Sequence, residues 1–573
     1  MLRSAVVAAL AAAWVAAPIA HADAPPGTVD ETPVQIAASL SDDEGNPVVL
    51  DGGVDVPRKG CPCPGVIINH GFLGNWKDSG SMARELASHG YVVLRYSSRG
   101  FGNTPGEVDL MGPKERQDLL DAVHWLNNPD SPVVGGKVTP DDIGQFGGSY
   151  GGAHAWSLAT SGDPAVRTVV PTATWTDIYD ALMPNDVELL AYLNGFYATG
   201  LDAGADLTNG DLPPRTTDNY SQEMHRWIAE ANTGLNTIDL KAGLDSRSVK
   251  GRYGDVHIPV FIIQGTNDGL FSANQAIDAY RALSAQHTPV RLYLGGIGHP
   301  PSDGSLDSPE AKHVSAEVLA WFDHYLKGEN NHIEKAPPIE ASHADYFGNH
   351  WDGKTQSAEA YPFGPAQTLR LCTTGPQGGT LSSDPCPDAL PAVAANSAGQ
   401  GLNQEPVTAN YMQDDPTGIA ATDLSQVPPT LSYDGATLTA AVNMIGVPSF
   451  SLQAASVDAL PAGLKGGAAA FQLDPKLYDV APDGTAKLLT RGAFAEPLNA
   501  QDPTAAQPQH EVAFDINGLS NVIPAGHHLR ITLSTSDAPY LRPTPNPFAV
   551  ALLAGSRVSL PTAGNMVATP SFD

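Results

Sequence analysis

The sequence predicts an α/β fold with a helical insertion, followed by an all-β domain. Strand and helix patterns alternate over residues 30–335, except at residues 175–250, where helical pieces and loops dominate. Residues 340–573 carry short strand-like runs between turn residues. A chain of 573 residues is long enough for more than one domain.

The first residues are typical of a secretory signal peptide. Met1-Leu2-Arg3 precedes an apolar run over residues 5–20, and Ala20-His21-Ala22 fits a small-x-small cleavage site. The run is short, alanine-rich and followed by a polar segment, so it is not read as a membrane span. We therefore expect residues 1–22 to be removed, the protein to be secreted, and no integral membrane association.

The chain is strongly acidic, with 31 Lys and Arg against 62 Asp and Glu and a formal net charge of −31. This excess of negative charge argues against nucleic acid or an anionic membrane as a partner. The expected partner is a small-molecule or peptide substrate. Composition does not fix the oligomeric state.

The first alternating elements are two apolar strands and an amphipathic helix. Residues 65–69 and 91–96 read as buried strands. Residues 114–125 read as a helix because Leu119, Val123 and Leu126 recur at helical spacing.

The most informative motif is Gly147-Gly148-Ser149-Tyr150-Gly151, which fits Gly-x-Ser-x-Gly. Residues 142–146 can form a short buried strand before it and residues 152–159 a helix after it. This context predicts the nucleophile turn of an α/β-hydrolase, in which glycines tolerate the strained backbone around Ser149. The alternative is a Gly-rich turn without catalytic function.

An acid and a histidine follow in the chain order that this fold requires. Asp268 comes directly after an apolar strand at residues 259–264, and His299 follows a strand at residues 290–294. In open α/β sheets, reactive groups gather outside the carboxyl ends of the strands. The alternatives are that Asp268 caps a helix beginning near Ser272 and that His299 is a surface loop residue.

The chemistry of acyl transfer gives each residue a role. His299 would take the proton of Ser149 and return it to the leaving group, while Asp268 orients the imidazole. The oxyanion hole would use the backbone N–H groups of Tyr150 and Phe72, the latter in the loop after the strand at residues 65–69. His70 is interpreted as a residue that orients this loop.

Helical patterns define the insertion and the end of the α/β domain. Residues 187–197 and 221–231 are predicted helices of a cap inserted at residues 175–250. A longer helix is expected after Ser308 as N-cap and Pro309 as first residue, and it would continue to Tyr325.

Residues 340–573 are predicted to form an antiparallel β-sandwich, with a jelly-roll arrangement preferred. No catalytic constellation occurs in this domain. The expected strands are residues 368–373, 437–444, 449–453, 476–480, 511–516 and 528–534.

The four cysteines suit an exported protein. Cys372 and Cys386 bracket a Gly/Pro/Ser-rich loop, and we expect a disulfide between them. Cys61 and Cys63 are read as a local disulfide or two reduced thiols rather than metal ligands, because no second Cys or His pair at zinc-finger spacing accompanies them. No metal or cofactor is expected.

The chain resembles the X-prolyl dipeptidyl-peptidase and cocaine-esterase family of serine hydrolases over nearly its whole length after residue 22. The motifs that carry the resemblance are Ser149-Tyr150-Gly151-Gly152, Arg99-Gly100-Phe101-Gly102, Trp175-Thr176-Asp177-Ile178-Tyr179, residues 477–484 and residues 524–530. The resemblance implies an α/β-hydrolase core, a helical cap, a C-terminal jelly roll and a triad of Ser149, Asp268 and His299.

Two positions depart from the family pattern. Family esterases often place a tyrosine after the early strand to serve the oxyanion, whereas this chain has Asn69-His70-Gly71-Phe72. A backbone donor is therefore expected instead. Ser97 stands where the family commonly has Asp before Arg-Gly-x-Gly, which we expect to alter loop packing rather than chemistry.

The substrate stays open between an acyl ester and a peptide with a free N-terminus. A peptidase of this kind would need a carboxylate near the site, and the candidates in the cap are Asp177, Asp180, Asp186 and Glu188. An acyltransferase with the same acyl-enzyme, and a non-catalytic binding protein on a hydrolase scaffold, are the alternatives in other classes.

Overall fold

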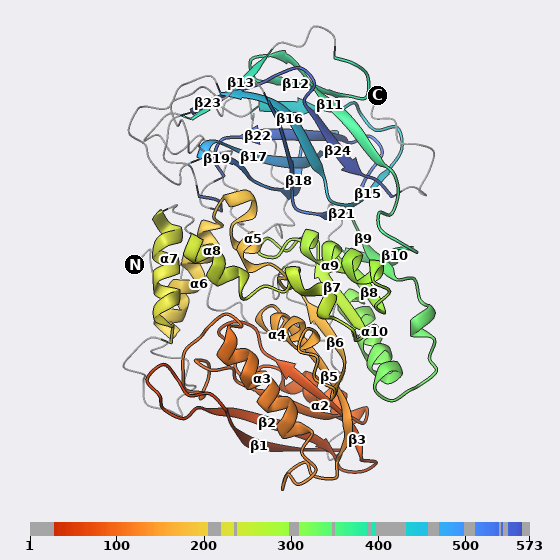
Figure 1. Ribbon diagram of the computed structural model, residues 1–573. Coiled ribbons are helices and arrows are strands. Elements are labelled where there is room, and N and C mark those ends of the chain that lie inside the picture. The colour runs from red at the N-terminus through yellow and green to blue at the C-terminus, as the bar shows by residue number, and fades with distance from the viewer. Residues whose placement is uncertain are drawn as a thin grey trace.

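The computed structural model describes residues 28–203, 219–233, 238–296, 299, 309–345, 350–386, 391–396, 431–456, 469–497, 510–537, 540–542 and 548–563. The predicted signal peptide at residues 1–22 and the predicted N-cap Ser308 lie outside these residues. The described chain forms an α/β part and a β-rich part that are stacked along the long axis of the molecule (Figure 1).

The α/β part is built on a ten-stranded sheet with the order β1-β2-β4-β3-β5-β6-β7-β8-β9-β10. The seven strands from β4 to β9 in this order run parallel. At the two edges, β2 and β10 run antiparallel to them, and β1 pairs antiparallel with β2. The strands are β1 Val29–Ala37, β2 Val49–Pro57, β3 Cys63–Asn69, β4 Val92–Tyr96, β5 Val138–Gly148, β6 Val166–Thr172, β7 Val260–Gly265, β8 Val290–Gly295, β9 Ile339–Asp345 and β10 His350–Ala358.

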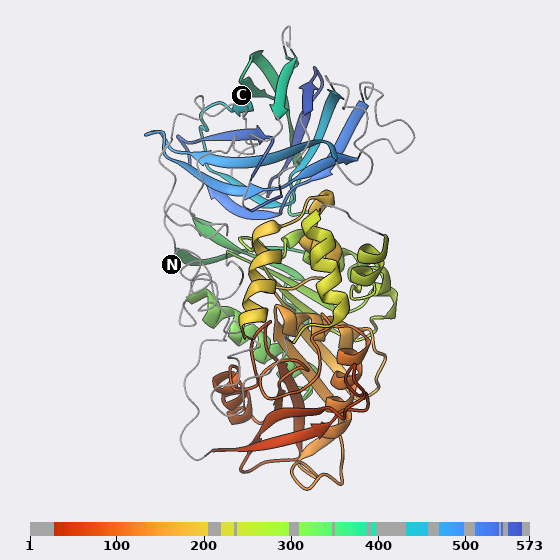
Figure 2. The same ribbon diagram turned by 90° about the vertical axis from the view of Figure 1, so that its left-hand side faces the viewer.

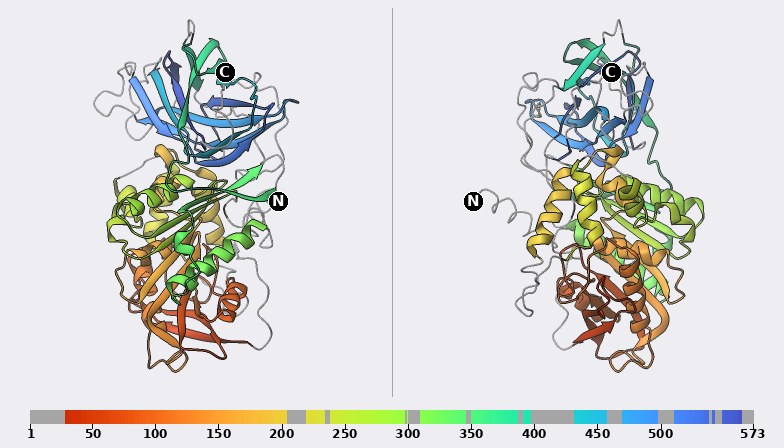
Figure 3. Two further views of the ribbon diagram at one scale, coloured as in Figure 1. Left: turned by 90° about the vertical axis from the view of Figure 1, so that its right-hand side faces the viewer. Right: turned by 60° about the vertical axis from the view of Figure 1, so that its left-hand side comes forward.

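Helices cover both faces of this sheet (Figure 3). One face packs against α2 and α10, and the other against α3, α4 and α9. A sheet covered on both faces explains the continuous apolar runs of the central strands, such as Val66-Ile67-Ile68 in β3. None of the helices in the described ranges is long and apolar enough to span a membrane. The helices are α2 Gly80–Ser88, α3 Pro113–Leu126, α4 Tyr150–Ala159, α9 Ala273–Ala285, α10 Pro309–Tyr325 and the short η3 Ile333–Lys335.

A helical insertion lies between β6 and β7, at the place where the sequence predicts a cap. Figure 2 shows its helices lying between the N-terminal strands of the α/β part, at the bottom of the view, and the β-rich part at the top. Its elements are α5 Ile178–Leu182, η1 Pro184–Asp186, α6 Leu190–Ala203, α7 Gln222–Thr233, α8 Ile238–Asp245 and η2 Lys250–Asp255.

The β-rich part contains a twelve-stranded sheet and a two-stranded sheet formed by β15 and β21. Its aliphatic and aromatic core is a separate cluster from that of the α/β part. The predicted jelly-roll arrangement stays a prediction. The strands are β11 Ala366–Gly375, β12 Gly378–Ser382, β13 Ala392–Asn396, β14 Leu431–Asp434, β15 Val442–Gly446, β16 Ser449–Ser456, β17 Ala469–Val480, β18 Ala486–Arg491, β19 Phe494–Pro497, β20 His510–Asp515, β21 Leu519–Ile523, β22 His528–Ser534, β23 Phe548–Leu552 and β24 Arg557–Pro561.

Two boundaries differ from the sequence-based expectation. β9 pairs with β8 and β10 pairs with β9, so the α/β sheet extends to Ala358, beyond the boundary expected at residue 340. Local patterns identify a strand but not its partner, which explains the difference. The strand expected over residues 437–444 begins only at Val442.

Both cysteine pairs form disulfides. Cys372 and Cys386 are joined, which confirms the predicted pairing. Cys61 and Cys63 are also joined, so the disulfide is the correct choice between the two possibilities left open for them.

Hydrogen bonds join the β-rich part to the α/β part. Asn274, at the start of α9, donates to the carbonyl of Ile516 at 3.0 Å and accepts from the N–H of Gly518 at 2.7 Å. Tyr540 donates its hydroxyl to the carbonyl of Gly269 at 2.7 Å. Gly269 directly follows Asp268, so a side chain of the β-rich part supports the loop of the predicted catalytic acid.

Candidate active site

Ser149 lies at the sharp turn between β5 and α4. Its φ of 56° and ψ of −119° place a non-glycine residue in a strained region of the backbone map. A Cβ at Gly147 would lie 2.3 Å from the carbonyl carbon of Gly151, and one at Gly151 would lie 2.2 Å from the carbonyl oxygen of Asn69. The glycines are therefore required by close backbone approach, and the motif is a strand–turn–helix junction.

The structure brings Ser149, Asp268 and His299 together. His299 Nδ1 lies 2.8 Å from Asp268 Oδ2, and His299 Nε2 lies 3.0 Å from Ser149 Oγ. A carboxylate accepts the Nδ1 proton, which leaves the Nε2 lone pair directed at the serine hydroxyl. All three residues are buried. The arrangement matches a nucleophile, a base and a group that orients the base.

Asp268 also holds its own loop. Its Oδ1 accepts from the N–H groups of Leu270 and Phe271, both at 2.9 Å. The helix α9 has Ser272 as its N-cap residue, so Asp268 stabilises the preceding turn rather than capping this helix. The two carboxylate oxygens thus have separate partners, and the side chain is fixed in the direction that reaches His299.

The two backbone groups predicted for the oxyanion hole lie on segments that flank the nucleophile. Tyr150 is the first residue of α4, where backbone N–H groups have no partner within the helix. A Cβ at Gly71 would lie 3.9 Å from Ser149 Cβ, and the Phe72 ring packs edge-on against Tyr150 with ring centroids 5.7 Å apart. The roles of the Tyr150 and Phe72 N–H groups stay predictions.

Glu115 is a buried residue of the site that the sequence reasoning missed. The hydroxyl of Tyr150 donates to Glu115 at 2.7 Å, and the N–H groups of Asp109 and Met111 donate to the same carboxylate. Burial raises the pKa of Glu115 to about 7. Its position four residues before Leu119, on the buried face of α3, is the signal that could have found it.

A cavity of about 100 Å³ opens beside Ser149 beneath the cap. The phenol groups in its wall direct their hydroxyls into protein: Tyr150 to Glu115, Tyr197 to His225 and Tyr220 to the carbonyl of Phe196. Apart from Ser149, the surface offered to a ligand is therefore largely apolar. The described lining residues are Phe72, Leu110, Ser149, Tyr150, Trp175, Ile178, Leu182, Met183, Leu193, Phe196, Tyr197, Tyr220, Met224, Trp227, Ile228, Ala231, Leu240, Leu244, Leu270 and Phe271.

The acidic residues proposed to bind a substrate ammonium do not line this cavity. Asp177 caps α5 through the N–H of Asp180, and Asp186 accepts from the hydroxyl of Tyr179 at 2.8 Å. Glu188 lies 3.5 Å from the guanidinium of Arg542. Asp180 lines a different, polar cavity between the cap and the β-rich part. Each of these carboxylates therefore has a position outside the described wall around Ser149.

The Arg99 motif is structural. The Arg99 guanidinium donates twice to Asp118, at 2.7 Å for both bonds, and also to the carbonyls of Leu40 and Ser41. Ser97, at the position where the family commonly has Asp, accepts from the N–H of Trp76 at 3.1 Å. Both interactions pack the loop after β4 and leave the reacting groups untouched.

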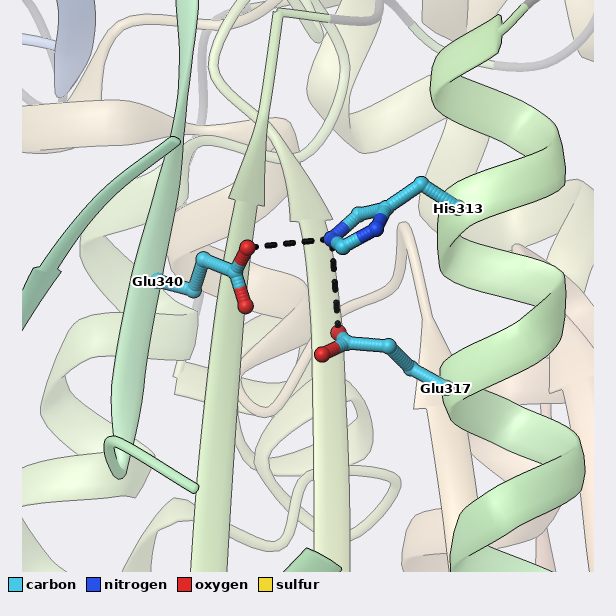
Figure 4. Close-up of side chains that lie close together, drawn as sticks. All are labelled: His313, Glu317 and Glu340. Atoms are coloured by element: carbon cyan, nitrogen blue, oxygen red, sulfur yellow. Dashed lines mark hydrogen bonds and ion pairs between the residues drawn. The ribbon is translucent and has the colours of Figure 1, made fainter. Parts of the chain in front are cut away.

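A second polar cluster lies away from the triad, between α10 and β9 (Figure 4). Within the part of the chain that the structure describes, His313, Glu317 and Glu340 place possible metal-ligand atoms within 4.8 Å of one another. However, the Arg291 guanidinium donates to Glu317 and, at 2.6 Å, to Glu340. One guanidinium thus already pairs with both carboxylates, and we interpret the cluster as an ion-pair network.

The parallel sheet, the nucleophile turn and the order of the three residues along the chain define an α/β-hydrolase. Residues 45–300 match the family model described as X-Pro dipeptidyl-peptidase (S15 family), and residues 278–567 match the model of the X-Pro dipeptidyl-peptidase C-terminal non-catalytic domain. The chain belongs to this family and is a serine hydrolase.

Individual relatives support the same assignment. A putative Xaa-Pro dipeptidyl-peptidase of Rhodopirellula baltica is 24% identical, over 86% of this chain and 75% of the relative. The cocaine esterase of Rhodococcus sp. (strain MB1 Bresler) is 22% identical, over 81% of this chain and 83% of the relative. An α-amino acid ester hydrolase structure superposes with a TM-score of 0.70 at 15% identity, covering 95% of this chain and 98% of that chain, which shows a shared fold.

Proposed function

We propose that the protein is a secreted ester hydrolase that acts through an acyl-enzyme on Ser149. His299 Nε2 takes the Ser149 proton as Oγ attacks the acyl carbon, and the N–H groups of Tyr150 and Phe72 bind the oxyanion. The imidazolium, stabilised by Asp268, then gives its proton to the leaving alcohol. Water activated by His299 attacks the acyl-serine and releases the acid.

The observation that carries this proposal is the unbroken chain of contacts from Asp268 through His299 to Ser149, at 2.8 Å and 3.0 Å. These distances lie within hydrogen-bond reach without any movement of the loops. This series of hydrogen bonds therefore supports general-base activation of Ser149.

The wall beside Ser149 favours an uncharged, apolar acyl group over a dipeptide with a free ammonium. Burying an ammonium without a paired carboxylate is strongly unfavourable. No residue among those described in the cavity wall is ionised at neutral pH. An engineered apolar cavity of about 150 Å³ binds benzene, so the volume of about 100 Å³ favours a short acyl chain or a small ring.

Export is proposed on two grounds. The first residues have the pattern of a signal peptide. Two disulfides are formed, and disulfides persist mainly in oxidising compartments.

The decisive experiment combines covalent labelling with a substrate panel. A fluorophosphonate is expected to modify the folded wild-type protein at Ser149, identified by peptide mass spectrometry. Butyryl and benzoyl p-nitrophenyl esters are expected to exceed Ala-Pro and Gly-Pro p-nitroanilides in kcat/KM by about 10²-fold or more, the range expected for an unpaired buried charge. Folded protein without a label would contradict the mechanism, and faster cleavage of the anilides would overturn the choice of ester.

A further inference from the structure

Each predicted oxyanion donor belongs to a peptide unit whose carbonyl points away from the reaction. The N–H of Phe72 and the carbonyl of Gly71 share one rigid plane, as do the N–H of Tyr150 and the carbonyl of Ser149. A group that fixes either carbonyl therefore also fixes the direction of the donor on the other side of the plane. The structure places a buried side chain on each of these two carbonyls.

His70 fixes the first of these peptide units, the one between Gly71 and Phe72. The backbone N–H of Ser98 donates to His70 Nε2 at 2.9 Å. Because a backbone nitrogen can only donate, Nε2 accepts and the ring proton lies on Nδ1. Nδ1 then donates to the carbonyl oxygen of Gly71 at 2.7 Å. The side chain of His70 is 1% exposed, so water does not compete for these bonds.

Thr174 fixes the second peptide unit, the one between Ser149 and Tyr150. Its hydroxyl donates to the carbonyl oxygen of Ser149 at 2.7 Å, and this oxygen also accepts from the N–H groups of Gly152 and Ala153 at the start of α4. The Thr174 backbone is itself tied to β7, because its N–H donates to Gln264 Oε1 at 3.3 Å. A Cβ at Gly152 would lie 2.6 Å from Thr174 Cβ, so the close contact also requires that glycine.

We propose that His70 and Thr174 are positioning residues of the oxyanion hole, which aim and polarise the Phe72 and Tyr150 N–H groups from the far side of their peptide planes. This inference rests on the proposed acyl-enzyme mechanism. A hydrogen bond accepted by a peptide carbonyl withdraws electron density from the attached nitrogen and strengthens its N–H as a donor. The preorganised plane also needs no rotation when the oxyanion forms.

The neutral state of His70 fits this role. Burial lowers the pKa of the His70 imidazole, so the ring stays uncharged at the pH at which His299 must act as a base. The bond pattern of His70 is therefore constant across the working range, and it adds no titration of its own to the pH profile above neutrality.

Two pairs of variants separate the proposed role from simple packing. His70→Asn keeps an amide donor near the position of Nδ1, whereas His70→Gln keeps an acceptor near the position of Nε2 and loses the bond to Gly71. Thr174→Ser keeps the hydroxyl, and Thr174→Val removes it at similar shape. Thr172→Val is the matched control, because its buried hydroxyl has no hydrogen-bond partner among the described residues.

The measurements are kcat and KM for p-nitrophenyl butyrate, the rate of phosphonylation by a small fluorophosphonate, the thermal midpoint and the pH profile. Losing an entire oxyanion donor lowers kcat by about 10²–10³-fold. We therefore expect a smaller decrease in kcat when the donor is present but its N–H points in a less favourable direction. His70→Gln and Thr174→Val should each lower kcat and the phosphonylation rate by about tenfold. KM and the acid limb of the pH profile should stay unchanged. His70→Asn, Thr174→Ser and Thr172→Val should remain within about threefold of wild type.

The outcomes are distinguishable. If His70→Gln and Thr174→Val fold and keep wild-type kcat, or if each equals its conservative partner, the positioning role is wrong while the hydrolase mechanism stands. If wild-type protein is neither active nor labelled, the mechanism itself fails. A loss seen in the thermal midpoint alone, with kcat unchanged, would assign both residues to stability only.

Discussion

The cavity beside Ser149 and the cavity between the cap and the β-rich part meet at one residue, Leu270, and have opposite chemistry. The first is the smaller, at about 100 Å³, and its described wall is apolar except at the nucleophile. The second is about 600 Å³, and its lining includes Asp180, Asp278, Arg281 and Asp515.

The nucleophile therefore lines the smaller of the two cavities, so the volume of a cavity does not identify the reactive site in this molecule. Ser149 lines the smaller cavity. Few polar groups there would compete with an oxyanion for a hydrogen bond from the Tyr150 or Phe72 N–H. Electrostatic stabilisation of an oxyanion is stronger where water and mobile charges are excluded. The larger cavity offers charges already partly compensated by Lys250 and Arg281.

Removing the nucleophile should have the largest effect on kcat. It tests whether the reaction takes place in the cavity that Ser149 lines. Ser149→Ala is expected to lower kcat on p-nitrophenyl butyrate by about 10⁴-fold or more, because the acyl-enzyme can no longer form. Stopped-assay kinetics with highly purified protein would measure it. A thermal midpoint like that of wild type is the control for folding, and activity near the wild-type level would exclude Ser149 as the nucleophile.

Placing a charge in the apolar wall should remove the contrast between the cavities. Met224→Glu introduces a carboxylate of similar length on α7, and we expect kcat/KM for apolar esters to fall by about 10²-fold because burying a charge is unfavourable. Esters of α-amino acids, which carry an ammonium, should lose less or gain. The measurement is kcat/KM for both substrate classes.

Two control variants accompany Met224→Glu. Met224→Leu conserves apolar character and should stay within about threefold of wild type. Asp278→Asn changes a charge in the polar cavity and should alter kcat/KM by no more than about twofold, as most surface substitutions do. A tenfold loss with Asp278→Asn would instead place the polar cavity on the route of the substrate.

The smallest expected effect concerns the buried carboxyl of Glu115 behind Tyr150. Its pKa is about 7 in the folded protein against an ordinary value of 4.5, so the folded state holds this proton more tightly than the unfolded chain. Its contribution to stability is therefore present below pH 4.5 and is lost as the pH rises through 7, by about 3 kcal/mol at 1.36 kcal/mol per pKa unit. Glu115→Gln should remove this part of the pH dependence.

Urea denaturation at pH 5 and pH 8 would measure the difference. Wild type should lose more stability than Glu115→Gln between the two pH values, whereas the exposed Glu329→Gln should follow wild type. Parallel slopes for all three proteins would mean that Glu115 is ionised throughout this range.

Groups whose positions follow from local rules could be predicted from the sequence. Ser149, Asp268 and His299 each follow a parallel strand, and such strands present their carboxyl ends at one edge of the sheet. Glu115 was missed because its contact with Tyr150 joins a helix to a turn 35 residues away. The pairing of β9 with β8 was missed because register and partner are set by tertiary packing rather than by the strand itself.

The bond from Tyr540 to the carbonyl of Gly269 joins the β-rich part to the turn that carries Asp268 in the α/β part, and we expect the activity of one part to depend on the other. A partial separation of the halves, by mild heat or low denaturant, would free the turn that carries Asp268 before either core melts. Inactivation should then precede the loss of secondary structure on heating. The isolated N-terminal half, even if it folded, would be a poor catalyst, because one support of its acidic loop is supplied from nearly the far end of the chain.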